Sequence, residues 1–106
     1  MIDMKILLFV SSNCRHCPKA EAAVRSVVPE YYGHDISFEK IRVKTDEGRQ
    51  LASRFNVMSL PTILMMDNDG NEIQRIVGIP SKENLRSDIE KGLGMKKSIF
   101  SKIFGR

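Results

Sequence analysis

The pattern of apolar and polar positions predicts that strands and helices alternate in the first half of the chain. Residues 5–10 form a short continuous apolar run that ends at two serines and an asparagine, which is typical of a buried strand. After Arg15 the apolar positions recur at a helical period, and Glu21 and Arg25 are expected to face solvent. Pro29 marks the end of this helix or a bend in it. The apolar stripe consists of Ala20, Ala23, Val24, Val27 and Val28.

Residues 36–43 alternate in a way that suits a strand with apolar side chains on both faces. One face carries Ile36 and Phe38, and the other carries Ile41 and Val43. Residues 45–47 then open a short helix whose inner side chains are expected to be Leu51, Ala52 and Phe55. A strand, helix, strand and helix in this order predict two parallel strands joined by a right-handed crossover.

The second half predicts an antiparallel hairpin and a final helix. Residues 62–67 and 72–77 read as strands, and the Asn-Asp-Gly-Asn sequence between them has strong turn chemistry. Ser81 starts the last helix, and the domain is expected to close near Gly94. Its inner face is expected to carry Leu85, Ile89 and Leu93, and its solvated face Lys82, Arg86 and Lys91. The predicted class is α/β, with the order β-α-β-α-β-β-α and a central mixed sheet of four strands flanked by helices.

The length and the charge distribution predict one domain over residues 1–94 and a separate basic segment over residues 95–106. A chain of 106 residues can bury one core. The last segment holds four of the 17 basic residues and no acidic one, so the other 13 basic residues balance the 13 acidic residues of the domain. We expect segment 95–106 to be disordered or a basic amphipathic helix with weak contact to a membrane surface or an acidic partner. A nucleic-acid partner is not expected, and neither is a signal peptide or a membrane span.

The candidate chemistry lies at the first junction between strand and helix, where Cys14 and Cys17 are three residues apart. If Cys14 caps the helix, its sulfur lies at the positive end of the helix dipole, and Arg15 and His16 add positive charge that favours the thiolate. Cys17, one turn further on, can close a disulfide with Cys14 and is expected to be the more buried of the two. Two closely spaced cysteines without a dispersed set indicate a reducing compartment, so we expect a cytoplasmic protein.

The Cys-x-x-Cys pair after the first strand, a Leu-Pro-Thr sequence at residues 60–62, a hairpin and a last helix resemble the thioredoxin superfamily over residues 5–93. The resemblance implies that Pro61 is cis and lies against the cysteines, and that the backbone of Leu60 pairs with a substrate strand. Met58 and Ile79 are then expected to contact the substrate. The closest subgroup is the small thioredoxin-like and glutaredoxin-like proteins of archaea and bacteria.

The sequence departs from that family at several positions. Asn13 stands where thioredoxins proper usually have Trp, and Leu8 stands where they often have a buried acid that handles the proton of the second cysteine. His16 before the second cysteine is similar to disulfide isomerases and periplasmic oxidants, whose thiolates are more stabilised. The loop after the hairpin differs from the glutathione loop of glutaredoxins.

The favoured function is a thiol-disulfide oxidoreductase that reduces protein disulfides through a Cys14/Cys17 cycle. No cofactor other than this redox-active disulfide is expected. The expected partners are disulfide-bearing proteins and an unidentified reductase, and we expect a monomer.

Two alternatives stay open. One is an oxidase or isomerase with the same fold, favoured by His16. The other is a soft-metal carrier that uses the cysteine pair, or half of a zinc site. Zinc needs two further ligands, and the histidines available are His16 and His34. We therefore expect no metal.

Overall fold

The computed structural model describes residues 2–95, which form four strands, three α-helices and one short 3-10 helix in the predicted order. The strands are β1 (Met4–Val10), β2 (Ile36–Arg42), β3 (Thr62–Met66) and β4 (Glu72–Val77). The helices are α1 (Cys17–Val27), η1 (Val28–Tyr31), α2 (Asp46–Arg54) and α3 (Lys82–Gly92). Segment 96–106, which contains most of the predicted basic tail, lies outside the described residues. No helix within residues 2–95 has the length and apolar character needed to cross a membrane.

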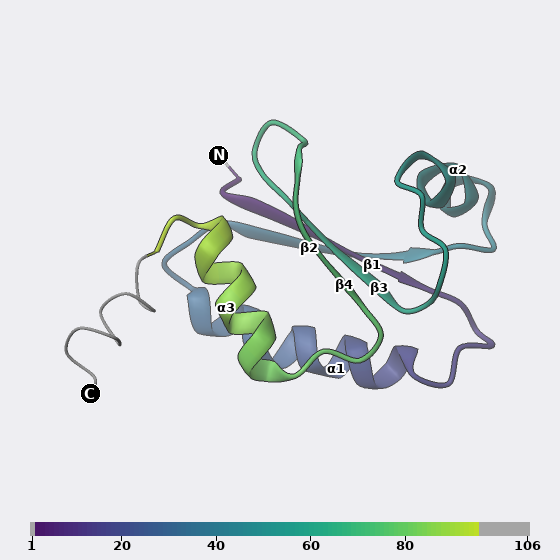
Figure 1. Ribbon diagram of the computed structural model, residues 1–106, viewed down its shortest axis with the longest axis horizontal. Helices are drawn as coiled ribbons and strands as arrows, with labels where there is room; N and C mark the ends of the chain where they lie inside the picture. The colour runs from purple at the N-terminus through teal and green to yellow at the C-terminus, as the bar shows by residue number, and fades with distance from the viewer. Residues whose placement is uncertain (1, 96–106) are drawn as a thin grey trace.

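The strands form one mixed sheet in the order β2-β1-β3-β4 (Figure 1). β1 and β2 are parallel and are connected through α1, as predicted from the alternation of strand and helix patterns. β3 pairs antiparallel with both β1 and β4. The carboxyl ends of β1, β2 and β4 and the start of β3 therefore lie at one end of the sheet, next to the cysteine motif.

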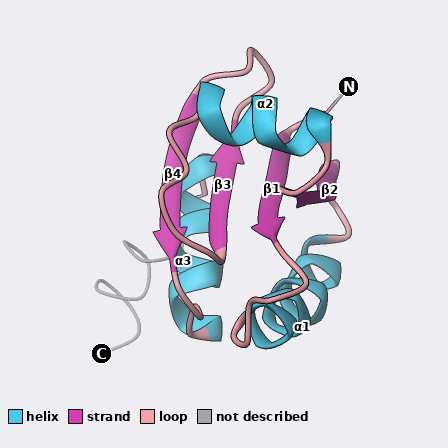
Figure 2. Cartoon of the chain, turned by 90° about the vertical axis from the view of Figure 1, so that its right-hand side faces the viewer, coloured by secondary structure: helices cyan, strands magenta, loops and turns pink. Residues whose placement is uncertain are grey.

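Helices cover both faces of this sheet. α1 and α3 lie on one face and α2 lies on the other (Figure 2). The strand β2 contributes side chains to both faces of the sheet. Ile36 and Phe38 pack against the core cluster on one face, and Ile41 belongs to the core cluster on the other. This confirms the prediction of a strand with apolar side chains on both sides.

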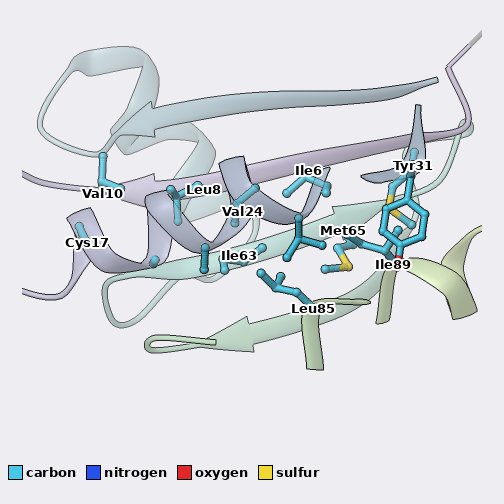
Figure 3. Close-up of a cluster of buried hydrophobic side chains, with 14 residues drawn as sticks. Ile6, Leu8, Val10, Cys17, Val24, Tyr31, Ile63, Met65, Leu85 and Ile89 are labelled. Carbon is cyan, nitrogen blue, oxygen red and sulfur yellow. The ribbon is translucent and has the colours of Figure 1, made fainter. Parts of the chain in front are cut away.

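The larger core cluster lies between the sheet and the helices α1 and α3 (Figure 3). Figure 3 shows Cys17 at one end of this cluster and Tyr31 at the other. Burial of its apolar side chains is the dominant favourable term for folding of the domain. The cysteine pair thus lies at one end of the larger core cluster (Figure 3). The side chains from β1 and α1 in the cluster are Met4, Ile6, Leu8, Val10, Cys17, Ala20, Ala23, Val24 and Val27.

The helix boundaries follow local chemistry. Thr45 and Ser81 cap α2 and α3, since their side-chain oxygens accept hydrogen bonds from the backbone N–H groups of Gly48 and Asn84. α1 ends at Val27, and the chain tightens into η1, which contains Pro29. The helix interior cannot accommodate this proline without losing a backbone hydrogen bond.

Two charged side chains that we expected to face solvent make contacts between elements. Glu21 on α1 turns towards β2, where Lys40 Nζ lies 3.3 Å from its carboxylate. Arg86 on α3 donates two hydrogen bonds to Glu30 of η1, at 2.8 and 2.9 Å. The helical period identified the outer faces, but it carries no information about which neighbouring element a long side chain can reach. Lys82 and Lys91 are exposed, as predicted.

Candidate active site

Cys14 and Cys17 form a disulfide at the start of α1, with their Cα atoms 5.4 Å apart. Cys17 is the first residue of the helix, is 4% exposed and belongs to the larger core cluster. Cys14 lies in the preceding loop and is half-buried. The predicted asymmetry, with the second sulfur the more buried, is confirmed.

The loop before α1 corrects the expectation that Cys14 caps the helix. His16 is the N-cap and makes no side-chain capping hydrogen bond, so Cys14 lies two residues before the cap. The reason is a tight turn, in which the backbone carbonyl of Ser11 accepts a hydrogen bond from the Cys14 N–H at 3.1 Å. The Ser11 hydroxyl oxygen accepts a further hydrogen bond from the Asn13 N–H at 3.1 Å. Cys17 consequently takes the first helical position, and Pro18 follows in the first turn, where its missing N–H costs little.

The second loop of the site contains a cis peptide bond between Leu60 and Pro61. The Thr62 hydroxyl donates a hydrogen bond to the Ser59 carbonyl at 2.6 Å, and the Gly78 N–H donates one to the Pro61 carbonyl at 2.9 Å. Leu60 is half-buried and packs against the same core cluster as Cys14. The fold thus brings the segment before β3 and the end of β4 to the end of the sheet where the disulfide lies.

Apolar side chains are exposed around this second loop. Met58 is 90% exposed and Ile79 is 45% exposed, whereas Pro61 is buried. Val77 is 59% exposed and was not identified from the sequence, although it pairs with Thr62 in the register of β3 and β4. Met58, Val77 and Ile79 are thus three large apolar side chains open to solvent in the segments that flank Pro61 in sequence or in the sheet.

The side chain of Leu8 lies in apolar surroundings. Leu8 is fully buried and belongs to the same cluster as Cys17. No carboxylic acid can therefore act on Cys17 from this position. Arg15 and His16, the predicted thiolate-tuning residues, are both exposed beside the disulfide in sequence.

Sequence reasoning missed a pocket of about 460 Å³ on the β2 side of the disulfide. Both cysteines line it, together with Glu21 of α1 and Lys40 and Arg42 of β2. The hydrogen bond from Arg25, together with Lys40, holds the pKa of Glu21 below its usual value. The signal that could have revealed the pocket is the recurrence of a cation at residues 40, 42 and 44, on a strand predicted to run parallel to β1.

Within residues 2–95, no group of three or more His, Cys, Asp or Glu side chains is arranged to hold a metal ion. His34 lies instead near Asp3, with 3.8 Å between Nδ1 and the carboxylate. His16 is the N-cap of α1. These two histidines therefore do not complete a site with the cysteine pair in this structure.

Comparison with known proteins agrees with this geometry. The family described as a thioredoxin-like domain matches residues 3–93. A thioredoxin of Methanocaldococcus jannaschii is 36% identical over 93 residues, which cover 88% of this chain and all of that protein. A probable thioredoxin of Archaeoglobus fulgidus is 34% identical over 91 residues, which cover 86% of this chain and 89% of that one.

Solved structures give the same result. A mutant thioredoxin from Halobacterium salinarum superimposes with a TM-score of 0.71 and 27% identity, covering 87% of this chain and 76% of that one. Thioredoxin-2 of the malaria parasite gives a TM-score of 0.72 and 28% identity over 84% of this chain and 82% of that one. The relatives and the Cys14–Cys17 disulfide together make this protein a thiol-disulfide oxidoreductase. By its sequence, its fold and its redox motif, the chain belongs to the thioredoxin superfamily.

Proposed function

We propose that the protein reduces disulfides in other proteins through a cycle between the Cys14/Cys17 dithiol and disulfide. The observation that carries the proposal is the unequal burial of the two sulfur-bearing residues. A half-buried Cys14 can reach a disulfide on another molecule, whereas Cys17 is held in the core within bonding distance of Cys14. This arrangement separates the attacking thiol from the resolving thiol.

The cycle starts from the reduced protein. The Cys14 thiolate attacks one sulfur of the substrate disulfide, so a bond forms between Cys14 and that sulfur and the other substrate sulfur leaves as a thiolate. The Cys17 thiolate then attacks Cys14 Sγ, which releases the second substrate thiolate and forms the Cys14–Cys17 disulfide. The substrate gains two electrons, the protein loses two, and water supplies the protons that the released thiolates take up. A reductase must then reduce the Cys14–Cys17 bond.

The loop of Leu60 and Pro61 is proposed to seat the substrate. Among residues 2–95, no hydrogen bond outside the helices and strands uses the backbone N–H or carbonyl of Leu60. An extended substrate segment can therefore pair with this backbone, and main-chain pairing accepts many sequences. The exposed side chains of Met58 and Ile79 then provide apolar contact beside it.

Arg15 and His16 are proposed to favour the Cys14 thiolate. Both are exposed and lie between the two cysteines in sequence, and positive charge close to a thiol lowers its pKa. The proposed location is the cytosol, where reducing conditions keep such a pair cycling.

The cysteine variants test the mechanism. Cys17→Ser is expected to accumulate a mixed disulfide with a protein substrate such as insulin, because the resolving thiol is missing. Cys14→Ser is expected to form no such adduct, and the double serine variant is the control for non-specific capture. Mass spectrometry under non-reducing conditions gives the readout. Full insulin reduction by both single variants would contradict the mechanism.

The direction of electron flow is tested by the reduction potential of the pair. Cytosolic reductants of this superfamily have potentials of about −270 mV, and periplasmic oxidants of about −120 mV. Equilibration with glutathione buffers, read out by alkylation of the free thiols, is expected to give a value close to the first. A value close to the second would instead select the oxidase or isomerase alternative.

A further inference from the structure

A concave site adjoins the disulfide on the side away from the proposed protein-binding loop. It lies between the end of β1, the start of α1 and the end of β2, and its volume is about 460 Å³. Cys14 and Cys17 both line it, whereas Met58, Leu60 and Pro61 do not. The disulfide is thus flanked by two different surfaces.

The side chains of this pocket carry an excess of positive charge. Lys40 and Arg42 are two residues apart on β2 and lie on the face that α1 covers, and Lys44 follows in the next loop. We call the pocket lined by these three cations and the two cysteines the basic pocket. Because β2 is an edge strand of the sheet formed by residues 2–95, its outer side is open to solvent.

The negative charge of the carboxylate that lines the basic pocket is already balanced by neighbouring cations. Glu21 accepts a hydrogen bond from Arg25 Nε at 2.9 Å and lies 3.3 Å from Lys40 Nζ. In contrast, no carboxylate within residues 2–95 forms an ion pair with Arg42 or Lys44. Two cationic side chains are therefore left to interact with a bound molecule.

A cavity of this size and charge suits one class of ligand. Pockets of roughly 300–1,000 Å³ hold small molecules, whereas protein partners are usually bound on larger and flatter surfaces. Cations around a concave site attract anions and raise their local concentration. A small molecule that carries carboxylate or phosphate groups fits these properties.

We propose that the basic pocket binds the anionic part of a small disulfide, which places one of its sulfurs within reach of Cys14. The proposal rests on the thiol-disulfide exchange described above and adds a substrate class to it. Cys14 bonds to one sulfur of the small disulfide and displaces the other as a thiolate. Cys17 then closes the disulfide with Cys14 and releases the second thiolate, so the dithiol of the protein supplies both electrons.

A series of small disulfides that differ in charge tests the proposal. The probes are 3,3′-dithiodipropionate, which is a dianion, 2-hydroxyethyl disulfide, which is neutral, and cystamine, which is a dication. For the wild-type protein we expect kcat/KM to fall in that order. The preference for the dianion over the neutral probe is expected to weaken with added salt, because salt screens exposed charges.

The test variant is Arg42→Gln with Lys44→Gln, and the matched control is Lys82→Gln with Lys91→Gln, two exposed lysines of α3. The test variant is expected to lower kcat/KM for the dianion about 4- to 20-fold and for the neutral probe less than about 2-fold. The control variant should keep the wild-type ratio between the two probes. The single variant Arg42→Lys keeps both positive charges, so it should retain most of the preference for the dianion.

The ratio between probes separates binding from reactivity. A change in the nucleophilicity of Cys14 alters the rates with all three disulfides in proportion, so it leaves the ratio unchanged. If the test variant and the wild-type protein show the same ratio of dianion to neutral rates, the basic pocket does not select anionic substrates. If the wild-type protein exchanged with none of the disulfides, insulin included, this result would instead contradict the proposed function.

Discussion

At the scale of single residues, Gly48 shows how a distant contact can reverse a local preference. Replacing glycine by alanine inside a helix usually stabilises a protein by about 0.5–1 kcal/mol. Gly48 is buried in the first turn of α2, and a Cβ atom there would overlap the backbone carbonyl of Arg42. A backbone group cannot move aside as the end of a flexible side chain can.

Gly48→Ala is therefore expected to destabilise the protein by about 1–3 kcal/mol, the usual cost of overpacking. Gly33→Ala is the matched control, because a Cβ atom at Gly33 has no neighbour within 4 Å. Its effect should stay within about 0.5 kcal/mol of zero. Urea unfolding followed by circular dichroism measures both variants. Equal stability of the two would show that α2 can shift away from β2 without cost.

A second prediction at this scale concerns the exposed apolar residues near Pro61. Met58→Ala with Ile79→Ala is expected to raise KM for insulin about 3- to 10-fold, because most contact residues cost less than about 1 kcal/mol each when they are truncated. The turnover of a small neutral disulfide should not change. Ile73→Ala, at the other end of β4 and 38% exposed, is the control for loss of surface area. An unchanged KM in the double variant would place the substrate elsewhere.

At the scale of elements, η1 and α3 are joined by a polar contact inside the core. The Tyr31 hydroxyl donates a hydrogen bond of 2.7 Å to Glu90, and both side chains are buried. Burial and the neighbouring carboxylate raise the pKa of Tyr31 well above its usual value. The pair fixes the short helix that follows α1 to the last helix.

Tyr31→Phe is expected to cost about 1–3 kcal/mol, because it removes a hydrogen-bond donor from a buried carboxylate. Tyr32→Phe is the control, since Tyr32 is 94% exposed. Thermal and urea unfolding of the two variants give the comparison. If Tyr31→Phe were as stable as Tyr32→Phe, water or another donor would have to satisfy Glu90 fully.

Much of the element scale was predictable from the sequence, and the exceptions have two causes. The apolar periods indicated every strand and α-helix, and α2 and α3 begin directly after Thr45 and Ser81, where helix starts were predicted. These signals are local, so one stretch of sequence contains them. The Arg86–Glu30 contact and the basic pocket depend on how elements approach one another, whereas the cap at His16 follows from the tight turn at Ser11. Periodicity along one element does not contain that information.

At the scale of the whole molecule, ionisable groups set the pH range of stability. Hydrogen bonds from Arg25 and Arg75 hold the pKa values of Glu21 and Glu72 below their usual values. Backbone N–H groups, that of Asn71 first, do the same for Asp67. A lowered carboxyl pKa stabilises the folded state above the unfolded-state value, and this stabilisation is lost as the pH falls through the folded-state value.

Stability is therefore expected to be nearly constant between about pH 5 and pH 9 and to fall below about pH 4. Above about pH 10 it should fall again, because the unfolded chain releases the Tyr31 proton while the folded chain retains it. Urea midpoints across pH measure the profile. In Tyr31→Phe the decrease in stability at alkaline pH should be smaller. An unchanged decrease in that variant would show that other groups cause it.

The arrangement of the chain ends bears on how the domain can be attached to other molecules. β1 begins and α3 ends at one end of the sheet, whereas the disulfide lies at the opposite end (Figure 1). A fluorescent reporter fused before Asp3, or a tether fused after Met95, would consequently sit a full strand length away from Cys14. Immobilised or fused forms of the domain should keep their access to bulky disulfide-bearing clients.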